Sequence, residues 1–150
     1  MSRFWLRWLT LVALAVIVFG LSMFLLPSLS QGFFNLLIFQ HIASPFAAAP
    51  ERYIVFICGI YGVTIVCWML ALLTIIVIPF RRGELWAWWA ITLSLGVWFV
   101  VDSTYSLAVG FSANAALNAT IFVMFAIPLT ATYKEFGHSS VRVDTFLSAK

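Results

Sequence analysis

Four apolar stretches, each long enough to cross a bilayer, occupy most of this chain of 150 residues. A hydrocarbon core of about 30 Å needs about 20 consecutive apolar residues in helical form. The stretches run from about Phe4 to Leu26, Tyr53 to Ile78, Glu84 to Val109 and Asn114 to Tyr133. Pro27 and Pro79 are expected to end the first two, and Pro128 to kink the fourth. We therefore predict an all-α membrane protein with four transmembrane helices in an antiparallel bundle.

The composition agrees with one membrane domain over residues 1–150. Hydrophobic residues make up 64% of the chain and charged residues 9%, whereas a soluble domain carries about 25% charged residues. We find no basic groove, so the net charge of +3 indicates topology and attraction to anionic membrane lipids rather than nucleic-acid binding.

Basic residues predict the orientation. If both termini are cytoplasmic, Arg52 is the one basic residue outside, in accord with the positive-inside rule. The basic residues predicted inside are Arg3, Arg7, Arg81, Arg82, Lys134, Arg142 and Lys150. Residues 134–150 then form a polar cytoplasmic tail.

The segment between the first two stretches is the longest predicted external loop. Its piece "GFFNLLIFQHI" is too short to span and too apolar to extend into water, which predicts a short interfacial helix. Near the opposite surface, tryptophans are expected to form an aromatic belt at headgroup level. They are Trp5, Trp8, Trp86, Trp88 and Trp89.

Asp102 is the most unusual residue within the apolar stretches. It lies eight residues before Gly110, hence about 12 Å below the outer end of its helix. A carboxylate deep in a bilayer costs about 2.5 to 3.5 kcal/mol on insertion scales and needs a partner or a task. Helical spacing predicts a polar cluster in the outer half of the membrane. Its candidate ligand-binding residues are Asp102, Trp98, Tyr105, Ser106, Asn114, Asn118 and Tyr61.

Two interpretations of this cluster are open. In the structural one, amides and hydroxyls satisfy the carboxyl group and fix the register of the helices. In the functional one, the cluster lines an outward-facing cavity for a lipid headgroup, a small molecule or a proton. We expect no catalytic residue, no metal site and no cofactor, although a bound lipid or pigment fits the functional interpretation. His41 and His138 are predicted on opposite sides of the membrane, so they do not share a metal.

The segments "RRGELWAWW" and "WFVVDS", with an asparagine-containing last span, carry a resemblance. They resemble small four-helix membrane proteins of bacteria, in which an Arg-x-Gly-Glu-x-Trp-Ala-Trp turn links the second and third spans. The resemblance implies the bacterial inner membrane and no particular activity. Trp98 and Asp102 also resemble, faintly, the acid-and-tryptophan pair of four-helix sterol isomerases, whose further acidic and histidine positions have no counterpart in these spans.

Three functions are therefore considered. The first is a non-enzymatic accessory or scaffold subunit of a larger membrane complex, with other membrane protein subunits as partners. The second is binding or transport of a lipid or small hydrophobic molecule in a pocket around Asp102. The third is an isomerase-like membrane enzyme, which requires a second acid or base beside Asp102.

Overall fold

The computed structural model describes residues 2–39 and 47–136, which are almost entirely helical. Four helices are long and apolar enough to cross a membrane, and each coincides with one predicted stretch. They are α1 (Arg3–Leu25), α3 (Ala48–Ile75), α4 (Leu85–Ala108) and α5 (Ser112–Phe136). The short helix α2 (Pro27–Phe39) follows α1, and a π-helical turn, η1 (Ile76–Phe80), prolongs α3. The prediction of an all-α chain with four candidate spans is confirmed.

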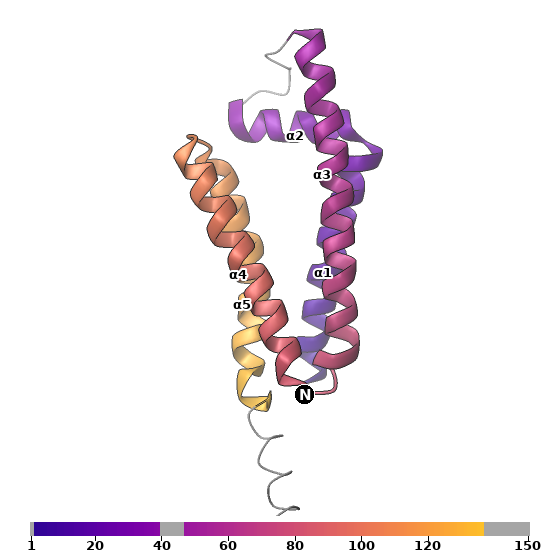
Figure 1. Ribbon diagram of the computed structural model, residues 1–150, viewed down its shortest axis with the longest axis vertical. Helices are drawn as coiled ribbons and strands as arrows, with labels where there is room; N and C mark the ends of the chain where they lie inside the picture. The colour runs from indigo at the N-terminus through magenta and orange to yellow at the C-terminus, as the bar shows by residue number, and fades with distance from the viewer. Residues whose placement is uncertain (1, 40–46, 137–150) are drawn as a thin grey trace, which may run out of the picture.

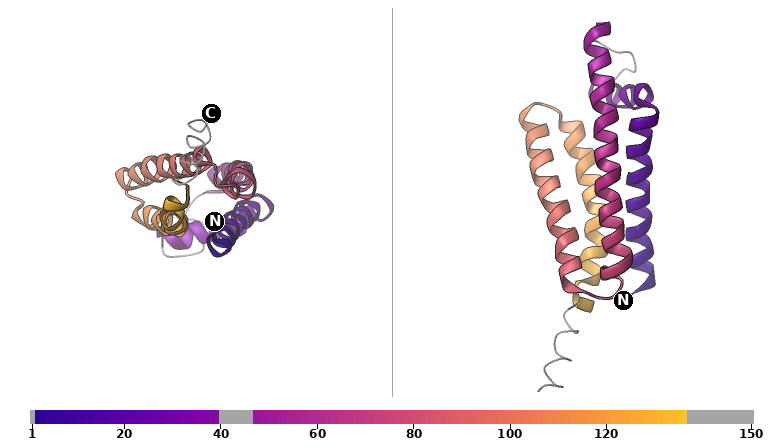
Figure 2. Two further views of the ribbon diagram at one scale, coloured as in Figure 1. Left: turned by 90° about the horizontal axis from the view of Figure 1, so that it is seen from below. Right: turned by 45° about the vertical axis from the view of Figure 1, so that its right-hand side comes forward.

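The helices form two hairpins that diverge from a common end (Figure 1). One hairpin pairs α1 with α3, the other pairs α4 with α5, and contacts within each hairpin far exceed those between them. Both described ends of the chain lie where the hairpins meet, and α2 lies across the opposite end. Figure 2 shows from below that the four long helices surround a common axis.

The end where the hairpins meet is a closed apolar core. Phe80 and Phe136 are buried, with ring centroids 4.8 Å apart. The backbone N–H of Ser2 donates to the Glu135 carboxylate at 3.1 Å, which joins the start of α1 to the end of α5. Burial of large apolar groups favours this closure. The described basic residues near this end are Arg3, Arg7, Arg81, Arg82 and Lys134, whereas Arg52 lies at the other end of α3.

Two glycines allow α1 and α3 to approach closely. A Cβ atom added to Gly62 would lie 2.5 Å from the carbonyl oxygen of Gly20, and one added to Gly20 would lie 2.9 Å from that of Gly62. The contacts are with backbone atoms, which do not move aside as a flexible side chain does. Small residues at such crossings are typical of helix pairs in membranes.

The helix ends differ from the predictions in two places. Pro79 does not end the second span, since η1 continues to Phe80 and the chain reverses at Gly83, whose φ is +79°. The wider π-helical turn accommodates a residue without an N–H. The fourth helix continues past Tyr133 to Phe136, so the predicted tail begins later, and its remainder, 137–150, lies outside the described residues.

The short helix α2 begins directly after α1. Leu26 separates the two helices, and Pro27 occupies the first position of α2, where its missing N–H costs nothing. A short helix is therefore present where an interfacial one was predicted, although Gln40 to Ile42 of that piece lie outside the described residues. Gln31 and Asn35 on α2 are buried, so the helix presents a polar side to the bundle.

Several tryptophans connect helices. Trp88 is 8% exposed and donates its indole N–H to the carbonyl of Leu129 on α5 at 2.8 Å. Its assignment to an aromatic belt is therefore wrong, because its ring faces the neighbouring helix. Trp8 on α1 donates to the carbonyl of Met124 on α5 at 2.9 Å. That carbonyl is four residues before Pro128 and is the one that proline leaves without its usual helical donor.

Candidate functional site

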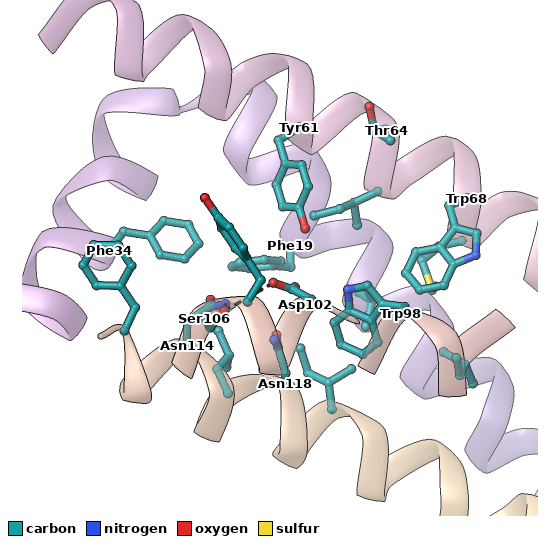
Figure 3. Close-up of a pocket in the computed structure, with 18 of the residues that line it drawn as sticks. Phe19, Phe34, Tyr61, Thr64, Trp68, Trp98, Asp102, Ser106, Asn114 and Asn118 are labelled. Atoms are coloured by element: carbon teal, nitrogen blue, oxygen red, sulfur yellow. Dashed lines mark hydrogen bonds between the residues drawn. The ribbon is translucent and has the colours of Figure 1, made fainter. Parts of the chain in front are cut away.

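A cavity of about 530 Å³ lies between the two hairpins, in the half of the molecule that contains α2 (Figure 3). Its inner end is formed by Met69, Leu95 and Phe125, which also belong to the closed core. Phe34 and Ile38 of α2 contribute to its wall from the opposite end. The cavity exists because the hairpins diverge while α2 bridges them. Its volume is within the range of sites for small organic ligands, about 300 to 1,000 Å³.

The structure brings all the predicted site residues together around this cavity. Those lining it are Tyr61 from α3, Trp98, Asp102, Tyr105 and Ser106 from α4, and Asn114 and Asn118 from α5. Helical spacing accounts for the four on α4, and the tight Val109–Phe111 link, with Gly110 at a φ of +88°, brings α5 beside them. Their role as ligand contacts stays a prediction.

Asp102 is at the end of a short hydrogen-bonded chain. The amide of Asn114 donates to the Ser106 hydroxyl at 2.8 Å, and that hydroxyl donates to Asp102 Oδ1 at 3.4 Å. The second bond is long for a hydroxyl and a carboxylate, for which about 2.5 to 2.7 Å is usual. The hydrogen bond from Ser106 therefore stabilises the charge of the carboxylate only weakly.

Asn118 also lines the cavity, but its hydrogen bond goes to a residue other than Asp102. Its amide donates to the hydroxyl of Ser103 at 3.5 Å, and both side chains are buried. Ser103 was not among the predicted residues, although it directly follows Asp102. This pair links α4 to α5, as the structural interpretation requires. It makes no hydrogen bond to Asp102, whose side chain lines the cavity. The structural interpretation therefore describes Asn118 and Ser103, and the functional interpretation of the residues around Asp102 stays a prediction.

The wall beside Asp102 is aromatic. The Tyr61 hydroxyl on α3 faces the Trp98 indole and the Asp102 carboxylate (Figure 3). Trp98 lies against Trp68, with ring centroids 5.7 Å apart, and Trp68 donates to the Ser94 hydroxyl at 2.9 Å. These contacts join α3 to α4 at the inner end of the gap between them.

Two exposed tyrosines line the cavity, one on α3 and one on α4. Tyr61 is 46% exposed on α3, and Tyr105 is 67% exposed on α4, although both line the cavity. The helices are close at the Gly83 turn and diverge from it (Figure 1). A molecule between the two tyrosines would therefore be reached from the side of the bundle.

Several lining residues on the α1–α3 hairpin and on α2 were not predicted. They include Phe19, Phe34, Thr64 and Trp68. Phe19 and Phe34 are in edge contact, with centroids 6.4 Å apart. The aromatic content of "GFFNLLIF" was visible in the sequence, but the position of Phe34 in the wall of this cavity depends on how the hairpins pair.

The four candidate spans define a multi-pass helical membrane protein, and a mainly apolar and aromatic cavity lies between its helices. Comparisons with protein-family models, with curated proteins and with solved structures gave no match for this chain. Within residues 2–39 and 47–136, no three His, Cys, Asp or Glu side chains come close enough together to hold a metal ion.

Proposed function

We propose that the protein binds an amphiphilic molecule, taken from the membrane or entering through it, in the cavity around Asp102. The observation that carries this proposal is the position of a carboxylate with one long hydrogen bond beside a mainly apolar and aromatic cavity of about 530 Å³. An apolar pocket with few polar groups is the usual form of a small-molecule site. An intramembrane acid in such a pocket favours a functional role.

We further propose that the cavity lies in the outer half of a bacterial inner membrane, with both termini in the cytoplasm. The described basic residues support this orientation, since five of them lie near the closed end and Arg52 lies at the other. In this orientation the gap between α3 and α4 faces lipid, and α2 lies toward the outer surface. Attaching a membrane-impermeant label to a single cysteine near either end tests the assignment.

Filling the cavity is expected to remove the bound molecule. Leu117 on α5 is half-buried and lines the cavity, so Leu117→Trp places an indole ring in the volume a ligand would occupy. We expect native mass spectrometry of protein released from native-lipid nanodiscs to detect one retained amphiphile on the wild type. Its occupancy should fall by about fivefold or more in the variant, because the added ring clashes with the ligand.

The adjacent residue provides a matched control. Ala116 is exposed and does not line the cavity, so Ala116→Trp adds the same ring on the outside of α5. This variant should retain the amphiphile as the wild type does. Equal occupancy in both tryptophan variants, or no retained molecule on folded wild type, would contradict ligand binding in the cavity.

An accessory-subunit role remains a second proposal. It rests on the small size of the protein and on its long apolar helices, whose exposed faces suit lipid and another membrane protein equally well. Purification from the native membrane in mild detergent separates the two functions, because a subunit should retain a partner of defined stoichiometry. The isomerase-like alternative has less support, since Asp102 is the one carboxylate among the described residues that line the cavity.

A further inference from the structure

The charged side chains that line the cavity determine whether it favours a cationic or an anionic amphiphile. Asp102 is the single charged side chain among the described residues that line it. Arg52 lies nine residues before Tyr61 on α3, about 14 Å along the helix. The Arg82 guanidinium lies 3.9 Å from the Glu84 carboxylate near the closed end. Glu84 is eighteen residues before Asp102, about 27 Å along the helix. No described basic side chain of the protein therefore shares the cavity with Asp102.

We infer that the ligand of this cavity is an amphiphilic ammonium ion, with Asp102 as its counter-ion and the aromatic wall as its cage. The inference rests on the proposed function and specifies its ligand class. A carboxylate accepts hydrogen bonds and attracts a positive charge strongly where water is scarce. An anionic head would meet this carboxylate with no described basic group in the cavity to offset the repulsion.

The aromatic side chains supply the second half of the recognition. Tyr61, Trp98 and Phe19 lie around the carboxylate (Figure 3). The faces of such rings attract quaternary ammonium groups, and a cage of several rings beside an acid is a common way to hold them. The remaining wall, with Val16, Ile65 and Phe125, suits an alkyl chain.

A pair of isosteric esters tests the charge requirement. Hexanoylcholine carries a quaternary nitrogen, and 3,3-dimethylbutyl hexanoate has carbon in its place. The protein is placed in nanodiscs of uncharged bilayer, and each dissociation constant is obtained from the concentration dependence of the unfolding midpoint, corrected for partitioning into the bilayer. We expect the wild type to bind the cation at least about tenfold more tightly than its neutral isostere.

Two substitutions locate the preference. Asp102→Asn keeps the shape of the side chain and removes its charge, so it should reduce the preference to about twofold or less while the neutral ester still binds. Glu84→Gln removes a carboxylate from the same helix outside the cavity and should leave the tenfold preference intact.

Palmitoylcholine distinguishes the source of the cation. An equal preference for the cationic ester over its neutral isostere at both chain lengths indicates a soluble ammonium ion. A preference found only with the palmitoyl chain indicates a lipid.

The outcomes separate this inference from the function on which it rests. Equal binding of the cation and its neutral isostere by the wild type at both chain lengths, or a preference that survives in Asp102→Asn, would overturn the ammonium assignment and leave ligand binding standing. If neither ester stabilises the folded wild type and no amphiphile is retained from native membranes, the proposed function itself fails.

Discussion

Replacing Gly62 with leucine is expected to separate α1 from α3 and to lower the free energy of unfolding by about 3 kcal/mol or more. A Cβ atom at this position would lie 2.5 Å from the Gly20 carbonyl oxygen and 2.7 Å from the Met23 Cβ atom. The first contact is with backbone, so relief requires movement of a whole helix. Because α1 and α3 form one wall of the cavity, this substitution should also disturb the ligand site.

Gly59 provides a matched control for this prediction. It lies on the same helix, one turn before Gly62, and a Cβ atom there would meet nothing within 4 Å. Gly59→Leu should therefore change stability by no more than about 1 kcal/mol. Unfolding by SDS in mixed micelles, followed by circular dichroism and tryptophan fluorescence, measures both variants. Equal stability of the two leucine variants would disprove the close crossing of α1 and α3.

Replacing Trp8 with phenylalanine is expected to destabilise the protein by about 1 to 2 kcal/mol. The substitution preserves most of the ring and removes the N–H that donates to the Met124 carbonyl at 2.9 Å. Pro128 has no N–H to give this carbonyl, so the oxygen would be left without a strong donor in an apolar environment. Trp86→Phe is the control, since the exposed Trp86 donates to Glu84 of its own helix and should contribute little.

A double-mutant cycle tests the link between Trp8 and Pro128 directly. In Pro128→Ala, the new backbone N–H of residue 128 can donate to the Met124 carbonyl. Trp8→Phe should therefore lower the free energy of unfolding less in this background than in the wild type. We expect a coupling free energy of about 1 kcal/mol between the two positions, measured in the same SDS titration. Additive effects would mean that Trp8 contributes through ring packing alone.

Much of the architecture followed from local properties of the chain. The length of each apolar stretch predicts a helix, and the four predicted stretches coincide with α1, α3, α4 and α5. Gly83 and Gly110 occupy left-handed turns at +79° and +88°, where short links reverse the chain. On α4, Trp98, Asp102, Tyr105 and Ser106 share a face because helical periodicity requires it.

Local pattern was less informative about helix ends and tryptophans. Pro79 was expected to end a helix, but a π-helical turn carries the chain to Phe80. Pro128 was expected to kink its helix; it lies within α5, and Trp8 supplies the donor missing at Met124. Trp88 was assigned to the membrane surface but lies in the core. Each outcome depends on a partner on another helix, which residue type and spacing do not specify.

The sequence by itself determined that the chain is helical, that four helices are apolar enough to span a membrane, and that α4 and α5 bring a carboxylate beside amides and hydroxyls. These properties depend on neighbours a few residues apart, where hydrophobic length, turn chemistry and helical periodicity operate. Only the tertiary structure decided that Gly20 meets Gly62, that the hairpins diverge, and that α2 completes a cavity of about 530 Å³ facing Asp102. Those contacts join residues distant in the chain, and their geometry depends on how side chains interlock between helices.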